Sequence, residues 1–211
     1  MTQTTTEVFA ASTVHEAAGR IGALPSRLKP VYPAARVHGR AFPVLCPVGE
    51  NLWLHRAVYA ARPGDVLVVA TTAVEEYGYW GEILSEAAAA RSLGGLVIDG
   101  GVRDVEVLPR TGFPVFAATT CLRGTGKSTE TGGGFPQEVV LGGVRVRRGD
   151  LVIGDQDGVV VVPADSVDDV LRASREREEK EAAIIAQLRE GASTIGLYGF
   201  PAVGSVEGAA S

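Results

Sequence analysis

The sequence is poor in cysteine, in aromatic residues and in long apolar runs, and these shortages exclude several classes of protein. Its 211 residues include two cysteines, Cys46 and Cys121, both in apolar surroundings, which predicts neither a disulfide framework nor a zinc site. The N-terminus, MTQTTTEVFA, lacks the basic flank and apolar core of a signal peptide. No apolar stretch approaches the roughly 18 residues that span a bilayer. We therefore expect a cytoplasmic protein with no membrane partner.

Basic residues are fewer than acidic residues. The chain has 20 Lys and Arg residues against 25 Asp and Glu residues, for a formal charge of −5. A protein that binds nucleic acid by neutralising phosphates has the opposite balance, so we expect no nucleic-acid partner. The apolar fraction of 45% and the charged fraction of 21% are typical of a globular domain.

Several common catalytic motifs are missing. The stretch GTGKST (124–129) resembles a phosphate-binding loop, but its glycines are too close together and no helix follows. There is no G-x-S-x-G nucleophile elbow. The three histidines, His15, His38 and His55, do not have metal-ligand spacing. The acidic stretch 155–158 lies between two predicted strands and is typical of a hairpin turn.

Strands alternate with helices in the first part of the chain, and a run of hairpin-connected strands follows. This order predicts an α/β protein with mixed sheets. Gly-rich residues 123–136 are predicted to form a loop. We expect a flexible arm at residues 1–10, an α/β domain at 11–164, a C-terminal helix and tail at 165–211, and helices at 11–23, 51–61 and 82–91.

The C-terminal helix is predicted to start at Asp165 or Ser166 and to end at Arg189 or Glu190, before Gly191. About 25 residues give a rod of roughly 37 Å, as long as a domain of this size. The middle of the helix, SREREEKEAA, has no apolar stripe. Such a helix either lies in solvent or reaches over another subunit, and both alternatives stay open.

The helix predicted to begin at Gly81 and Glu82 is a candidate for anion binding. Its first amides point out of the helix, and a helix N-terminus attracts negative charge. Gly81 would let a ligand approach the backbone closely. The alternative is that Glu82 is there only because a carboxylate is favourable in the first turn.

The stretch LVIDGGVRDV (96–105) is the second candidate. We expect LVID to be a strand, and Asp99 with two glycines to form a turn that presents Arg103 and Asp104. A carboxylate suits a hard divalent cation, and an arginine can hold a substrate carboxylate and offset enolate charge. The alternative is a turn followed by a surface ion pair. Glu82 and Asp104 are expected at opposite ends of the intervening helix, so their convergence would require the turn to fold back or a neighbouring subunit.

Four blocks of the sequence together resemble the RraA-like family, which includes the 4-hydroxy-4-methyl-2-oxoglutarate and 4-carboxy-4-hydroxy-2-oxoadipate aldolases. The resemblance covers about residues 12–190. It implies stacked mixed β-sheets flanked by helices, of the swivelling β/β/α type, assembled as homotrimers or homohexamers with active sites between subunits. The four blocks are GEIL (81–84), GGLVIDGGVRD (94–104), GFPVFA (112–117) and GGVRVRRGDLVIGDQDGVVVVP (142–163).

The resemblance implies a carbon–carbon lyase that uses Mg or Mn. Its substrates would be 4-hydroxy-2-oxo acids, cleaved to pyruvate and a second oxo acid through a pyruvate enolate, and oxaloacetate, which would be decarboxylated. Asp104 lies where the family's aspartate binds the metal directly, and Arg103 where an arginine holds the substrate. Glu82 would contact the metal through water and relay protons. Further implied contacts are substrate binding by Asn51 and by the backbone of Gly81, Glu82, Ile83 and Leu84, and a water-mediated metal contact from Glu178 or Glu179 of a neighbouring subunit.

Not every member of the family is an aldolase. One branch inhibits ribonuclease E by binding it, and its members lack the full carboxylate set. This chain has Glu82, Arg103 and Asp104, which favours the enzyme. The alternatives are a non-catalytic RraA-type regulator of a ribonuclease, and a scaffold whose metal site survives without its natural substrate.

Overall fold

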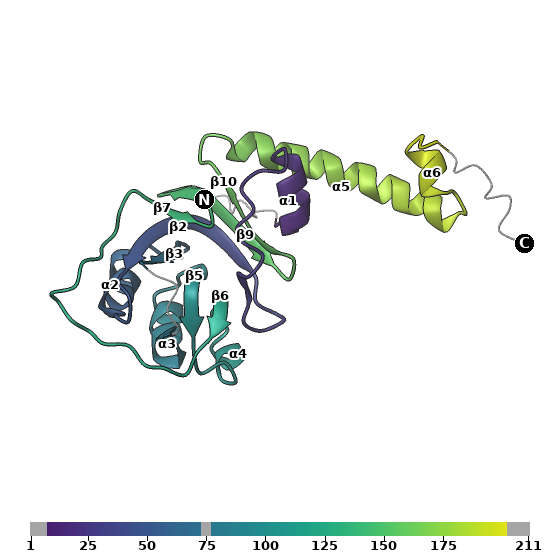
Figure 1. Cartoon of the computed structure of the whole chain (residues 1–211). Coiled ribbons are helices and arrows are strands. Elements are labelled where there is room, and N and C mark those ends of the chain that lie inside the picture. The colour runs from purple at the N-terminus through teal and green to yellow at the C-terminus, as the bar shows by residue number, and fades with distance from the viewer. Residues whose placement is uncertain (1–7, 73–76, 202–211) are drawn as a thin grey trace, which may run out of the picture.

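A single curled sheet of eight strands forms the centre of the computed structural model, which describes residues 8–72 and 77–201 (Figure 1). Its middle strands are parallel and apolar, as in the VLVVA of β3, because both faces of the sheet are covered. The strand order is β1 (Lys29–Pro30), β6 (Val115–Thr120), β5 (Gly95–Val102), β3 (Val66–Thr71), β2 (Val37–Cys46), β9 (Leu151–Asp155) and β10 (Gly158–Val162), with β4 (Gly78–Trp80) paired to β5.

The six helices of the described residues lie outside the sheet, and a hairpin stacks on it. The hairpin lies against β2 and β3, so the predicted class of stacked mixed sheets with flanking helices is confirmed. The helix expected at 11–23 is shorter than predicted, because Gly19 and Arg20 take left-handed φ angles of 75° and 65°. The elements are α1 (Ala11–Ala17), α2 (Leu52–Ala60), α3 (Glu82–Ala90), α4 (Leu108–Thr111), α5 (Val167–Arg189), α6 (Thr194–Leu197) and the hairpin strands β7 (Glu138–Leu141) and β8 (Val144–Arg147).

The two ends of the sheet approach each other, so that the sheet nearly closes into a barrel. The segment before β1 reaches β10 through a bridge between Ala23 and Val160. Two backbone hydrogen bonds reinforce this bridge: the Val161 amide donates to the Gly22 carbonyl, and the Leu24 amide donates to the Val159 carbonyl, each at 2.9 Å. This closure removes most of the free strand edge that an open sheet would expose.

Gly22 makes the closure possible, and its replacement by alanine is expected to destabilise the protein. Gly22 has a φ of 79°, and a Cβ there would overlap the carbonyl oxygen of Val161. Gly19 has a similar φ of 75° but open space around it. Gly19→Ala should therefore cost only the backbone strain, about 1 kcal/mol, and Gly22→Ala should cost about 2 kcal/mol more. Urea denaturation of both variants measures the difference, and equal costs would contradict the proposed role of Gly22 in closure.

A small second core lies between β9, β10, α1 and the start of α5. Phe9, 3% exposed, packs there with Val14 and Val170. The predicted N-terminal arm is thus anchored at Phe9, and its residues 1–7 lie outside the described residues.

Helix α5 runs far beyond this core. Its buried residues, Val170 and Ser174, lie in its first two turns, and the rest of the helix projects away from the sheet (Figure 1). Glu178 and Glu179 are exposed on the projecting part. No helix in the described part of the chain is both long enough and apolar enough to cross a membrane.

Candidate functional site

Asp104 and the start of α3 meet at the carboxyl edge of the parallel strands. The Glu82 backbone amide donates to Asp104 Oδ2 at 3.1 Å. Helix α3 starts at the end of β4, runs back along the sheet, and leads into β5, which returns to the same edge. The prediction that Glu82 and Asp104 lie at opposite ends of the helix is therefore wrong, because a helix between parallel strands has its N-terminus where the strands end.

The predicted Asp-Gly-Gly turn is also wrong. Strand β5 continues through Asp99 and both glycines to Val102, with a register shift against β6 after Ile98. A Cβ at Gly101 would overlap the carbonyl oxygen of Tyr77, so this glycine lets the segment leading into β4 lie close to β5. The chain turns at Asp104 instead, whose φ is 59°.

Asp99 has a structural contact. Its carboxylate accepts hydrogen bonds from Arg27 Nε at 2.9 Å and from Arg27 Nη2 at 2.6 Å. This two-point pairing joins the segment before β1 to β5, and leaves Asp99 outside the residues that line the cavity beside Asp104.

A cavity of about 140 Å³ opens beside Asp104. Its charged lining residues are two cations, Arg103 and Lys127, and one anion, Asp104. The excess of positive charge contrasts with the formal charge of −5 of the chain and suits a small anionic ligand. The remaining lining residues are Asn51, His55, Gly78, Tyr79, Trp80, Gly81, Ile83, Leu84, Gly124 and Thr125.

Arg103 and Asp104 form an exposed ion pair, and both also line the cavity. Arg103 Nε lies 3.7 Å from Asp104 Oδ2, and the side chains are 46% and 39% exposed. A long, exposed pair of this kind contributes little to stability. The backbone of Arg103 is nevertheless held in place, because its amide donates to the Trp80 carbonyl at 2.8 Å. Both charged residues therefore line the cavity, and their contact with each other is long.

Asn51 also lines the cavity, and one of its polar atoms has no hydrogen-bond partner among the described residues. Its Nδ2 donates to the Tyr79 carbonyl at 2.9 Å, and the residue is 7% exposed. Its Oδ1 is buried and has no hydrogen-bond partner among the described residues. Because a buried acceptor is normally paired, Oδ1 is suited to accept a hydrogen bond from a ligand hydroxyl.

Replacing Asn51 by aspartate is expected to lower the free energy of unfolding by about 2 kcal/mol. The change keeps the size of the side chain but replaces the Nδ2 donor by a second acceptor that faces the Tyr79 carbonyl. Chemical denaturation at neutral pH measures the loss. Glu86→Gln, at an exposed position of α3, provides a matched polar control, and an N51D variant as stable as this control would contradict the argument.

Seven lining residues were not predicted, among them His55, Thr125 and Lys127. His55 lies four residues after Asn51, and residues four apart lie on the same face of a helix. This spacing could have identified His55 as a lining residue. Burial lowers the pKa of His55, and the Lys127 charge lowers it further, so the imidazole is neutral near neutral pH. Thr125 and Lys127 belong to the predicted loop, and the sequence shows no sign that this loop returns to the cavity.

Glu50 holds the loop against the site. Its Oε2 accepts from the Ser128 amide at 2.7 Å, and the Gly126 carbonyl accepts from the Asn51 amide at 3.1 Å. A Cβ at Gly126 would lie 2.5 Å from Glu50 Oε1, so a side chain there would displace the Glu50 carboxylate that holds the loop. The loop is thus tied to the start of α2, which keeps Lys127 at the cavity.

Of the other predicted site residues, some line the cavity and some do not. Gly81, Ile83 and Leu84 line the cavity, and the binding of a substrate carboxylate by their backbone stays a prediction. The Glu82 side chain is exposed and is not among the lining residues, although its amide binds Asp104. Glu178 and Glu179 do not reach the cavity within one chain.

The described residues offer no group of three or more His, Cys, Asp or Glu side chains that could hold a metal ion. Asp104 is the one carboxylate among the described residues that line the cavity. Magnesium and manganese suit carboxylate ligands, and Mg²⁺ binds through one or two of them while keeping several waters. The donor set therefore fits a largely hydrated divalent cation at Asp104 and does not fit zinc.

Comparisons with known proteins agree with this architecture. Residues 5–161 match the RraA-like family, described as Aldolase/RraA. A protein of Halalkalibacterium halodurans, provisionally named 4-hydroxy-4-methyl-2-oxoglutarate aldolase, is 32% identical over 161 residues, which is 76% of this chain and 75% of the relative.

Two solved structures are also similar. An uncharacterized protein of Pseudomonas syringae pv. tomato has a TM-score of 0.75 at 26% identity, covering 88% of this chain and 90% of the other. RraAS2 of Streptomyces coelicolor, described as an unusual member of the RNase ES inhibitor RraA protein family, has a TM-score of 0.70 at 25% identity, covering 85% and 90%.

Proposed function

The chain belongs to the RraA-like family, and from this premise we propose that it is a divalent-metal-dependent lyase for 4-hydroxy-2-oxo acids that also decarboxylates oxaloacetate. The observation that carries the proposal is the position of the Asp104 carboxylate, held by the N-terminus of α3 beside Arg103 in a small cavity with excess positive charge. The name of the relative from Halalkalibacterium halodurans supports the aldolase part of this proposal.

The cavity suits the two ends of such a substrate. The first turn of α3 presents the amides of Ile83 and Leu84 for the carboxylate of the 2-oxo acid. Arg103 is placed to donate to the 2-oxo oxygen and to stabilise the enolate charge that develops there. The free Oδ1 of Asn51 is placed to accept from the substrate hydroxyl.

The cleavage then follows the ordinary retro-aldol course. The 4-hydroxyl loses its proton, the bond between C3 and C4 breaks, and its electron pair forms the pyruvate enolate, which takes a proton at C3. Oxaloacetate gives the same enolate with loss of carbon dioxide. A cation held by Asp104 would supply Lewis-acid polarisation of the 2-oxo group. Glu82, exposed beside the cavity, is the proposed proton relay through water.

We also propose that the active unit is a homotrimer or homohexamer. The projecting part of α5 supports this, because the helix extends well beyond the core that its first turns pack against and can reach a neighbour. Glu178 or Glu179 would then approach the cavity of the adjacent subunit and bind a water of the metal shell.

Metal removal tests the activity. With a lactate dehydrogenase coupled assay, oxaloacetate and 4-hydroxy-4-methyl-2-oxoglutarate should yield pyruvate in the presence of Mg or Mn, and EDTA should reduce the rate to background. Restoring either metal in excess should restore turnover. Absence of pyruvate with both substrates and both metals would overturn the proposal.

A second candidate is regulation of a ribonuclease by binding, which the likeness to RraAS2 supports. A binding protein would show no turnover but would retain a ribonuclease in a pull-down. Asp104→Asn separates the two candidates, since it should abolish catalysis and leave partner binding intact.

A further inference from the structure

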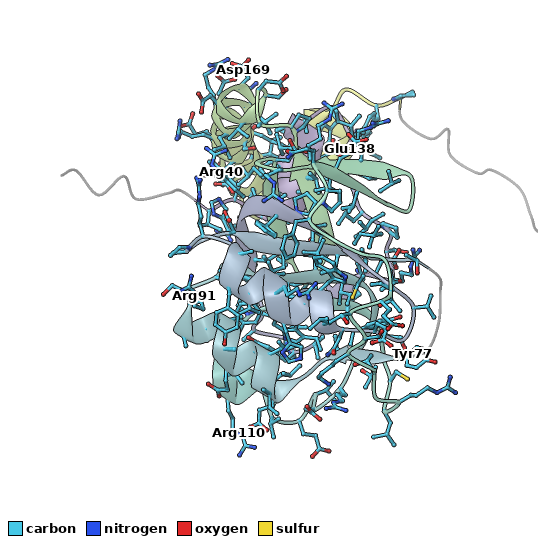
Figure 2. All side chains as sticks on the ribbon, turned by 90° about the vertical axis from the view of Figure 1, so that its left-hand side faces the viewer. Arg40, Tyr77, Arg91, Arg110, Glu138 and Asp169 are labelled. Carbon is cyan, nitrogen blue, oxygen red and sulfur yellow. The ribbon has the colours of Figure 1, made fainter. Side chains whose placement is uncertain are left out.

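A second hollow lies at the amino edge of the parallel strands and is lined by three arginines, Arg40, Arg62 and Arg148. It has a volume of about 290 Å³. Arg40 lies just before the residues of β2 that pair with β3, at the amino end of this pairing. Asn51, which lines the cavity at Asp104, follows the carboxyl end of β2. Figure 2 shows Arg40 on one side of the molecule and Tyr77, which precedes β4, on the other. This hollow is therefore separate from the cavity at Asp104.

Two of the three arginines are held in position by groups other than acids. Arg40 Nη1 donates to the Gly149 carbonyl at 3.1 Å. The Arg148 guanidinium lies over the Phe42 ring, 4.1 Å from its centroid. In the part of the chain that the structure describes, none of the three forms an ion pair with a carboxylate, although the chain has more acidic than basic residues.

Asp65 is the acidic residue of this lining. Its Oδ2 accepts a hydrogen bond from the Arg62 amide at 2.9 Å. The Asp65 carboxylate therefore has a structural role in the turn before β3. Three guanidinium groups and one carboxylate leave an excess of two positive charges. A phosphate monoester carries about −1.5 to −2 at neutral pH and matches this excess. Guanidinium groups also pair with phosphate oxygens in a two-point geometry.

A neighbouring hollow of about 440 Å³ shares Arg40 and Asp65 with the first. Leu151 and Leu171 give it apolar walls, and His38 also lines it. The Nε2 of His38 is buried and has no hydrogen-bond partner among the described residues. Burial lowers the pKa of His38, which keeps the ring neutral. An uncharged ligand group that forms a hydrogen bond would satisfy this nitrogen.

We propose that the two hollows bind one phosphorylated small molecule, with its phosphate on Arg40, Arg62 and Arg148 and its hydroxyl-bearing part against His38. The site is independent of the proposed lyase activity, because none of these residues lines the cavity at Asp104. The three arginines specify the head group, and the unpaired imidazole nitrogen specifies the remainder.

Calorimetric titration of the full chain with inorganic phosphate and with ribose 5-phosphate tests the proposal. Ribose 5-phosphate should bind more tightly than phosphate. Arg62→Ala, which removes no hydrogen bond or ion pair of that side chain within the described residues, should weaken both about tenfold. Arg40→Ala should do the same. His38→Leu should lower the affinity for ribose 5-phosphate to that for inorganic phosphate.

A matched control separates this site from others. Arg91→Ala, an exposed arginine at the end of α3, should leave both affinities unchanged. Loss of binding in this control, no binding to the wild type, or equally tight binding of citrate at matched ionic strength would overturn the proposal. A change in molecular mass of Arg62→Ala by light scattering would also overturn it, since copies of the chain would then meet at this surface.

Discussion

Asp104→Asn is expected to lower kcat/KM for oxaloacetate about 1000-fold, equivalent to roughly 4 kcal/mol of transition-state stabilisation. The substitution removes the only carboxylate among the described lining residues of the cavity and with it the direct ligand proposed for the metal. Asparagine is the informative choice because Asp104 has a φ of 59°, a conformation that asparagine tolerates and alanine does not. Activity should be measured at saturating metal with the coupled assay.

Glu106→Gln controls for the loss of one negative charge from the same loop. Glu106 is exposed and does not line the cavity, so its replacement should leave kcat/KM within about twofold of wild type. Metal binding measured by calorimetry should be lost in D104N and kept in E106Q. An active D104N variant would show that the metal, or the reaction, lies elsewhere.

Gly81→Ala is expected to lower activity at least about 100-fold, which corresponds to roughly 2.7 kcal/mol. A Cβ at Gly81 would overlap Asp104 Oδ2, the oxygen that accepts from the Glu82 amide. The Asp104 carboxylate is therefore forced off the N-terminus of α3. The backbone itself tolerates alanine, because Gly81 has an extended conformation with a φ of −161°. The expected loss thus comes from a displaced metal ligand and not from unfolding.

Gly124→Ala is the matched control within the same cavity. A Cβ there meets only the Arg103 Nη1 at 3.5 Å, an ordinary contact with the end of a flexible side chain. This variant should keep activity within a fewfold of wild type, with unchanged thermal stability for both glycine variants. If both lost activity equally, filling of the cavity would explain the result and the Asp104 contact would not.

Local patterns were sufficient for most of the helices and strands. The apolar run of β3, the Ala-rich α3 and the glycine-separated strands after residue 138 each have a period or a turn signal that depends on a few neighbouring residues. The predicted helix at 51–61 agrees with α2 within one residue at each end. Where local signals conflicted with packing, prediction was wrong. Gly100 and Gly101 are typical of a turn, yet they lie in β5. Glycine is needed at both positions because the backbone at Tyr77 and the side chain of Tyr79 lie too close to leave room for a larger residue.

The sequence alone determined the candidate residues, since Arg103 and Asp104 follow a buried strand and Gly81 starts a helix, and their types indicate anion and metal chemistry. Only the tertiary structure decided that they meet. Helix α3 runs antiparallel to β5, which brings its N-terminus to Asp104, and Glu50 ties a distant loop to the site so that Lys127 faces it. Such convergence depends on strand order and loop closure over tens of residues, and no local period in the sequence encodes it.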